Sequence, residues 1–66
     1  MKLRVNDQER ELPEGTTVAL LLERLALAAE RVAVERNGAI VPRGDYGEAR
    51  LAEGDSLEIV QFVGGG

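Results

Sequence analysis

The sequence contains no cysteine, no histidine and no tryptophan, and only one tyrosine and one phenylalanine. Without cysteine no disulfide can form, and without cysteine or histidine the chain lacks the side chains that usually hold structural zinc. A domain of 66 residues therefore depends on a small apolar core alone. The lack of cysteine fits a reducing compartment, and we expect the protein in the cytoplasm.

Side chains suited to catalysis are equally scarce. Histidine, the most frequent general base, and cysteine, a common nucleophile, are both absent. Paired carboxylates would need a pocket on the order of several hundred Å3 to hold a substrate, and a domain this small has little volume for one. We therefore expect a protein that is not an enzyme, with no metal site and no cofactor bound by this chain.

Long apolar runs and basic clusters are missing as well. A membrane-spanning helix needs about 20 consecutive apolar residues, and the first residues do not resemble a signal peptide. The formal net charge is −4, which argues against a nucleic-acid partner because phosphate binding needs a basic face. After Arg50 the side chains include Glu53, Asp55 and Glu58 and no cation. This acidic end is either a solvated face or a surface that meets a basic partner.

The first half of the chain predicts a hairpin followed by a helix. Residues 2–6 alternate polar and apolar, as in a half-buried strand, and residues 9–12 return as its partner. Thr16 or Thr17 is placed to cap a helix that we expect over residues 18–29, which are rich in leucine and alanine. The apolar stripe of this helix consists of Val18, Leu21, Leu22 and Leu25.

The second half predicts three more strands. Residues 32–36 are rich in β-branched side chains, and Asn37-Gly38 is a strong signal for a type I′ turn leading into residues 39–41. Residues 43–50 contain several turn-forming residues and are expected to form a loop with a short helical turn. Residues 57–63 form the last predicted strand.

This order of elements predicts an α+β fold of the β-grasp (ubiquitin-like) type, with a mixed sheet of four to five strands packed on one helix. We expect a single domain over residues 1–63 and a flexible glycine tail over residues 64–66. The predicted core joins the helix stripe to alternate strand residues, namely Leu3, Val5, Leu12, Val32 or Val34, Leu57 and Ile59.

Two side chains of the predicted loop have ordinary structural interpretations. Tyr46 is expected to pack its ring over the loop and to keep its hydroxyl in water. Arg43 is expected to be a surface charge that pairs locally, with an acidic group of a partner as the alternative.

The three glycines at positions 64–66 form the most informative feature of the sequence. Terminal glycines alone are mostly frayed ends, but these follow directly on an apolar strand of a predicted β-grasp. A tail without side chains can pass through a narrow channel and place the Gly66 carboxylate beside ATP held by a partner enzyme. Attack on the α-phosphate gives an acyl adenylate, and a sulfur nucleophile can then displace AMP to leave a thiocarboxylate. We expect Gly64 and Gly65 to contact that partner.

Val60 and Phe62 form a second candidate feature. If Leu57 and Ile59 face the helix, strand alternation places Val60 and Phe62 on the opposite side of the sheet. Such residues are frequent interface anchors, so we interpret them as a docking patch for a partner. Scattered surface hydrophobicity, or cover from the loop over residues 43–50, is the alternative.

Several stretches together resemble the ThiS family of sulfur carriers in thiamine biosynthesis, over the whole length of the chain. They are Val5-Asn6, Gly15 to Val18 leading into Leu21-Leu22, VERNGAIVPR from Val34 to Arg43, Tyr46, Gly54-Asp55, and the run from Ile59 to Gly66. A Gly-Gly end is shared by all ubiquitin-like carriers. The Asn-Gly hairpin running into Val41-Pro42-Arg43, combined with the short length and that end, is more specific.

The resemblance implies a set of partners for the tail. Gly65 and Gly66 correspond to the family's terminal glycine pair, and Gly66 would be adenylated by a ThiF-like activating adenylyltransferase that uses ATP. A sulfur donor enzyme would supply sulfur derived from cysteine, and a ThiG-like thiazole synthase would receive it. A carrier for molybdopterin synthesis or tRNA thiolation would share the tail chemistry and differ in its docking surface. A ubiquitin-like protein modifier or a pure binding module is the alternative of a different class.

Overall fold

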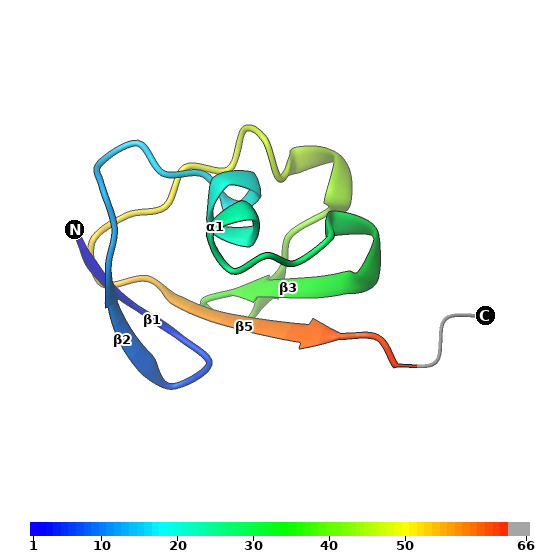
Figure 1. Cartoon of the computed structure of the whole chain (residues 1–66). Helices are drawn as coiled ribbons and strands as arrows, with labels where there is room; N and C mark the ends of the chain where they lie inside the picture. Colours follow the sequence, from blue (N-terminus) through cyan, green and yellow to red (C-terminus); the bar gives the residue numbers. More distant parts are fainter. Residues whose placement is uncertain (64–66) are drawn as a thin grey trace.

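The computed structural model describes residues 1–63, which form a five-stranded mixed sheet with one helix across one face (Figure 1). Along the sheet the strand order is β2-β1-β5-β3-β4, and only the β1–β5 pair is parallel. This arrangement is the predicted β-grasp fold. In chain order the elements are β1 (Lys2–Val5), β2 (Gln8–Glu11), α1 (Val18–Arg24), the 3-10 turn η1 (Ala29–Arg31), β3 (Val32–Arg36), β4 (Ala39–Ile40), the 3-10 turn η2 (Arg43–Asp45) and β5 (Ser56–Gln61).

Both hairpins close through turns in which the two central residues have positive φ. Asn37 and Gly38 have φ of 52° and 85°, as the Asn-Gly signal predicted for a type I′ turn between β3 and β4. Asn6 and Asp7 have φ of 49° and 66° and connect β1 to β2 in the same way. Because this turn geometry matches the twist of the strands, it fixes the register in both hairpins.

The helix begins as predicted, and the structure distinguishes the roles of the two threonines. Thr17 is the N-cap, and its hydroxyl accepts a hydrogen bond from the Leu20 N–H at 3.2 Å. The Thr16 hydroxyl instead donates to the Pro13 carbonyl at 2.7 Å and fixes the loop that precedes the helix.

The helix is shorter than predicted because it ends at Arg24. Ala26 adopts a φ of 58°, its N–H donates to the Glu23 carbonyl, and the Leu27 N–H donates to the Leu22 carbonyl at 2.9 Å. These two bonds form a Schellman motif, whose left-handed position is usually glycine. Because alanine and not glycine occupies this position, the sequence gives no signal for the end of the helix.

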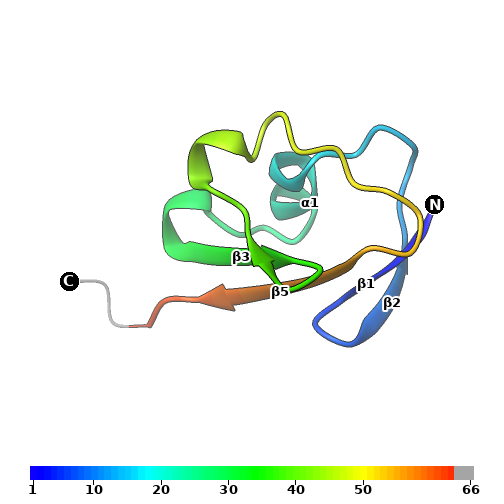
Figure 2. The same cartoon turned by 180° about the vertical axis from the view of Figure 1, so that it is seen from behind.

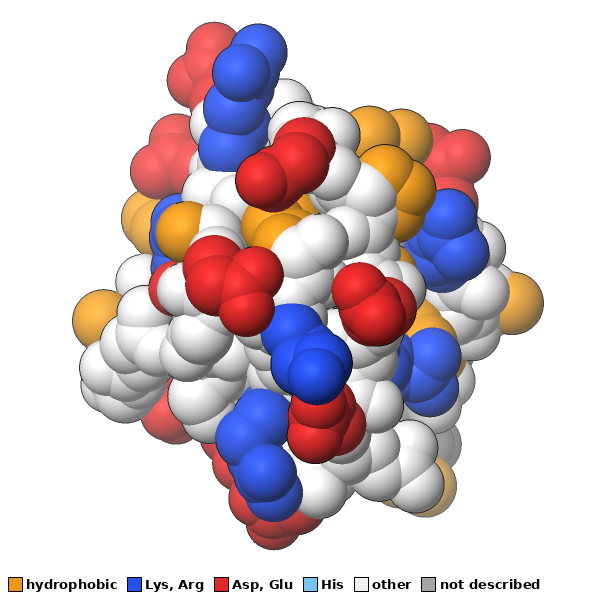
Figure 3. All heavy atoms as spheres, turned by 90° about the vertical axis from the view of Figure 1, so that its left-hand side faces the viewer, with side chains coloured by type: hydrophobic (Ala, Val, Ile, Leu, Met, Phe, Trp, Pro, Cys, Tyr) orange, Lys and Arg blue, Asp and Glu red, His pale blue; other side chains and the backbone are white. Residues whose placement is uncertain are grey.

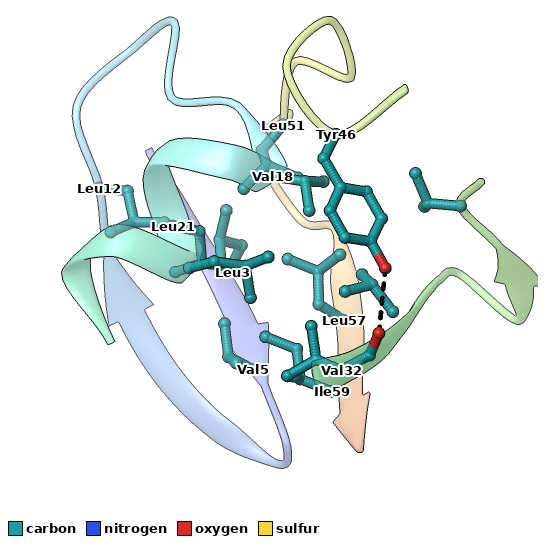
Figure 4. Packing of buried hydrophobic residues seen from close by; sticks show 13 residues of the cluster. Leu3, Val5, Leu12, Val18, Leu21, Val32, Tyr46, Leu51, Leu57 and Ile59 are labelled. Atoms are coloured by element: carbon teal, nitrogen blue, oxygen red, sulfur yellow. Dashed lines mark hydrogen bonds between the residues drawn. The ribbon is translucent and has the colours of Figure 1, made fainter. Parts of the chain in front are cut away.

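The core lies between the helix and one face of the sheet, and it contains every predicted strand residue (Figure 4). The sequence left open whether Val32 or Val34 lies in the core, and the structure buries both. The buried hydrophobic residues are Leu3, Val5, Leu12, Val18, Leu21, Leu22, Val32, Val34, Val41, Tyr46, Leu51, Leu57 and Ile59.

The expectation that the Tyr46 hydroxyl stays in water is wrong. Tyr46 points from the end of η2 into the core, and its hydroxyl donates to the Val32 carbonyl at 3.5 Å (Figure 4). The η2 segment therefore closes one end of the core. Figure 2, seen from behind, shows this segment following β4 and passing beside α1.

The last strand also ends earlier than predicted, at Gln61 instead of Val63. Its pairing continues one step further, because the Phe62 N–H donates to the Arg31 carbonyl at 2.8 Å. Within residues 1–63, no helix is long and apolar enough to cross a membrane.

Candidate functional site

The end of β5 is the candidate site, since it leads directly to the glycine run. β5 lies between β1 and β3 in the sheet, and in Figure 1 residues 62–63, drawn in red, lie away from the body of the molecule. Val63 is 95% exposed and makes no part of the core. The predictions for Gly64, Gly65 and Gly66 concern positions outside the described residues.

Val60 and Phe62 lie on the surface, as strand alternation predicted. Their exposed fractions are 59% and 51%, whereas Leu57 and Ile59 on the other side of the strand are buried. The alternative in which residues 43–50 cover them is therefore wrong, because that loop packs at the helix side through Tyr46. Val60 stands directly opposite Ala33 of β3 in the antiparallel register. The strand end thus presents apolar side chains to solvent immediately before the tail.

Asn6 holds β5 in place near this end, a role that its place at the end of the predicted first strand did not reveal. Its side-chain Oδ1 accepts from the Ile59 N–H at 2.7 Å, and its Nδ2 donates to the Ile59 carbonyl at 3.1 Å. The carboxamide therefore copies the hydrogen bonds of a peptide group and prolongs the β1–β5 ladder beyond Val5. The available sequence signal was an asparagine followed by an aspartate at the end of an alternating run, because such side chains often hydrogen-bond to nearby backbone.

The predicted acidic end does not form one surface, because Asp55 is buried. Its carboxylate accepts hydrogen bonds from Arg36 Nε at 2.9 Å, Asn37 Nδ2 at 3.0 Å and the Ala52 N–H at 2.8 Å, and Arg36 Nη2 lies 2.8 Å away. Burial by itself raises the pKa of the Asp55 carboxyl, but the hydrogen bonds from Asn37, Ala52 and Arg36 and the charge of Arg36 bring the pKa below its ordinary value. Asp55 ties the β3–β4 turn to the start of β5, and it is not available to a partner.

Arg43 forms no ion pair within residues 1–63, and its expected local pairing is instead with main-chain carbonyl oxygens. Its Nε donates to the Ala29 carbonyl at 3.0 Å, and Nη2 donates to the Glu30 carbonyl at 3.4 Å. These bonds link η2 to η1, which directly precedes β3. They stabilise the η1 segment, which lies next to the end of β5.

The site is an exposed strand end and not a pocket. Two open hollows of about 420 and 450 Å3 lie elsewhere, one beside β4 and η2 and the other between the Pro13 loop and α1, and neither is lined by a residue of β5. Residues 1–63 contain no group of three or more acidic side chains placed to hold a metal ion. The described part of the site is thus a strand end with exposed apolar side chains.

Comparisons with known proteins agree with this geometry. The model of the ThiS family matches residues 2–66. The sulfur carrier protein ThiS of Bacillus subtilis is 38% identical over 65 residues, covering 97% of this chain and 98% of that protein. The crystal structure of the thiamine biosynthesis protein ThiS from Geobacter metallireducens superposes with a TM-score of 0.84 at 36% identity, covering 100% of both chains.

A longer relative is also similar. A thiazole synthase of Magnetococcus marinus is 48% identical over 66 residues, which is 100% of this chain and 20% of that protein. The chain thus spans about a fifth of the length of this relative. Because the family model matches residues 2–66 and a relative covered over nearly its whole length is 38% identical, the chain belongs to the ThiS family.

Proposed function

We propose that this chain is a sulfur carrier of thiamine biosynthesis and that the carboxylate of Gly66 is its reacting group. The observation that carries the proposal is the end of β5, an exposed apolar strand end that leads directly into three glycines. Membership of the ThiS family and the similarity to a full-length sulfur carrier support it. The protein acts as a co-substrate, and partner enzymes in the cytoplasm supply the catalysis.

The chemistry requires two displacements at the tail. In the first, a Gly66 carboxylate oxygen attacks the α-phosphorus of ATP on a ThiF-like adenylyltransferase, and pyrophosphate leaves. In the second, hydrosulfide supplied by the sulfur donor attacks the activated carbonyl carbon, AMP leaves with the electrons of the broken C–O bond, and the S–H proton passes to solvent. The product is a thiocarboxylate, which carries sulfur in nucleophilic form. Gly64 and Gly65 allow the tail to enter a narrow channel because they have no side chains.

Two partners follow from the proposal. Val60 and Phe62 make the apolar part of the contact with the adenylyltransferase, where exposed aromatic and branched side chains are suited to anchor binding. A ThiG-like thiazole synthase then receives the sulfur. The similarity of this segment to part of a longer protein named thiazole synthase supports that second partner.

The experiment is exchange of labelled pyrophosphate into ATP by a purified ThiF-like adenylyltransferase in the presence of the chain. Intact mass first verifies that the protein used carries a free carboxylate on Gly66. We expect exchange with the native chain and none with a variant that lacks Gly66 or carries one added residue after it. Circular dichroism melting serves as the fold control, since the change lies outside the core. Equal exchange with the extended variant would contradict the proposal.

A further inference from the structure

The outer face of the sheet, which points away from α1, divides into two halves of different charge. On the β1–β2 half, acidic and basic side chains alternate, and Lys2 Nζ lies 3.5 Å from the Glu9 carboxylate. Arg4 stands opposite Glu9 in the same register. Figure 3 shows such interspersed charges at the end of the molecule that carries the N-terminus. This half needs no partner to balance its charge.

The β5–β3–β4 half carries only acidic and apolar side chains near its centre. Glu35 of β3 stands directly opposite Glu58 of β5, and both are exposed. Ile40 of β4 stands opposite Glu35 on one side, and Val60 follows Glu58 along β5 on the other. We refer to Glu35, Glu58, Ile40 and Val60 as the acidic–apolar patch. Ile40 is 64% exposed and Val60 is 59% exposed, so the apolar side chains at both ends of the patch are accessible to a partner.

The pairing of Glu35 with Glu58 works against the fold. Residues directly opposite in an antiparallel pair have neighbouring Cβ atoms, and like charges in this position destabilise the sheet. The ion pairs formed within residues 1–63, Lys2–Glu9 and Arg36–Asp55, leave both carboxylates without a cation within 4.0 Å. A like-charge pair flanked by exposed apolar side chains suits a binding surface, where a cation of the partner offsets the repulsion between the two carboxylates.

We propose that a lysine or arginine side chain of the activating adenylyltransferase lies between Glu35 and Glu58, with Ile40 and Val60 in apolar contact on either side. This inference rests on the proposed function. The adenylyltransferase is the partner expected at the acidic–apolar patch because β5 continues from Glu58 through Val60 to the tail. A chain advances at most about 3.6 Å per residue, so the eight steps from Glu58 to Gly66 keep the patch within roughly 29 Å of the reacting carboxylate. An enzyme that holds the tail beside ATP therefore has this part of the sheet within its reach.

The test compares two double variants with the same change in charge. In E35Q/E58Q the patch loses both carboxylates, and in the control E9Q/E11Q the β1–β2 half of the same face loses two. For each, the dissociation constant is measured by titration with the ThiF-like adenylyltransferase without ATP, and KM and kcat by pyrophosphate exchange at low and high salt.

We expect E35Q/E58Q to raise the dissociation constant and KM by about tenfold at low salt, to leave kcat unchanged, and to weaken their dependence on salt. The control should stay near the native values. The melting temperature of E35Q/E58Q should equal or exceed that of the native chain, because the like-charge repulsion is removed. A merely structural role would move it the other way.

Native affinity and native KM in E35Q/E58Q would overturn the inference while leaving the proposed function in place. An equal loss in the control would overturn it too, because the effect would then be one of overall charge. If the native chain binds the enzyme but supports no pyrophosphate exchange, the proposed function fails, and the dissociation constants alone decide the inference. If the two proteins do not bind at all, both proposals fail.

Discussion

Both sides of β5 carry apolar side chains, but those on one side are buried and those on the other are exposed. On the side that faces α1, Leu57 and Ile59 are 1% and 8% exposed and belong to the core. On the outer side, Val60 is 59% exposed and follows the acidic residue Glu58. Burial on one side supplies the free energy that stabilises the fold. The residues on the other side add little to stability and remain available for a partner.

The largest expected effect is on the buried side. We predict that Leu57→Ala lowers the free energy of unfolding by about 2 to 5 kcal/mol, because it removes a fully buried side chain and leaves a cavity. Urea denaturation measures this change, with Val60→Ala as the matched control on the outer side. A loss of similar size in the two variants would break the comparison.

A smaller effect distinguishes two carboxylates. We predict that Asp55→Asn costs about 1 to 3 kcal/mol at neutral pH, since it weakens hydrogen bonds to a buried charged group, whereas Glu58→Gln costs nothing. The folded-state pKa of Asp55 lies below the ordinary value of 3.8, so its contribution is fully present above that value and is lost as the pH falls through the folded-state pKa. Urea midpoints of the native chain and Asp55→Asn should therefore converge in acid. A constant gap from pH 7 to below pH 3 would contradict this account.

On the outer side the order of effects is reversed. We predict that Phe62→Ala weakens binding to the activating adenylyltransferase by about 1 to 2 kcal/mol, or roughly tenfold, and lowers the free energy of unfolding by less than about 0.5 kcal/mol. Titration calorimetry and urea denaturation measure the two quantities. Equal losses of binding and stability would assign Phe62 to the core.

The smallest effect concerns the helix that covers the buried side. Ala26 has a φ of 58°, a conformation that costs L-residues with a Cβ about 1 to 2 kcal/mol. We therefore predict that Ala26→Gly raises the free energy of unfolding by about 0.5 kcal/mol, the strain relief being partly offset by the greater freedom of glycine in the unfolded chain. A lower melting temperature in Ala26→Gly would show that this alanine is not strained.

Most of the fold was predictable from local patterns, because alternation, the Asn-Gly turn and the leucine stripe all point to the same order of elements. The end of the helix was not, since an alanine occupies the position where glycine usually signals it. The burial of Asp55 and the Tyr46 hydroxyl depends on contacts with Arg36 and Val32, which are distant in sequence. No local pattern reports such contacts.

The candidate site was predictable in one part and missed in another. The exposure of Val60 and Phe62 followed from strand alternation. The hydrogen bonds of Asn6 to Ile59 join positions at opposite ends of the chain, as does the parallel pairing of β1 with β5. The opposition of Glu35 and Glu58 depends on the register of β3 with β5, which only the structure provides.

The central claim is that Gly66 becomes the carrier of sulfur. The most direct measurement is the intact mass of the protein after incubation with ATP, the ThiF-like adenylyltransferase and a sulfur donor, followed by fragmentation to locate the change. We predict a gain of about 16 Da, one oxygen replaced by sulfur after displacement of AMP at the acyl carbon, confined to the C-terminal fragment. An unchanged mass with enzymes shown to be active on another carrier, or the chain found only in isopeptide linkage to lysines of other proteins, would contradict the account.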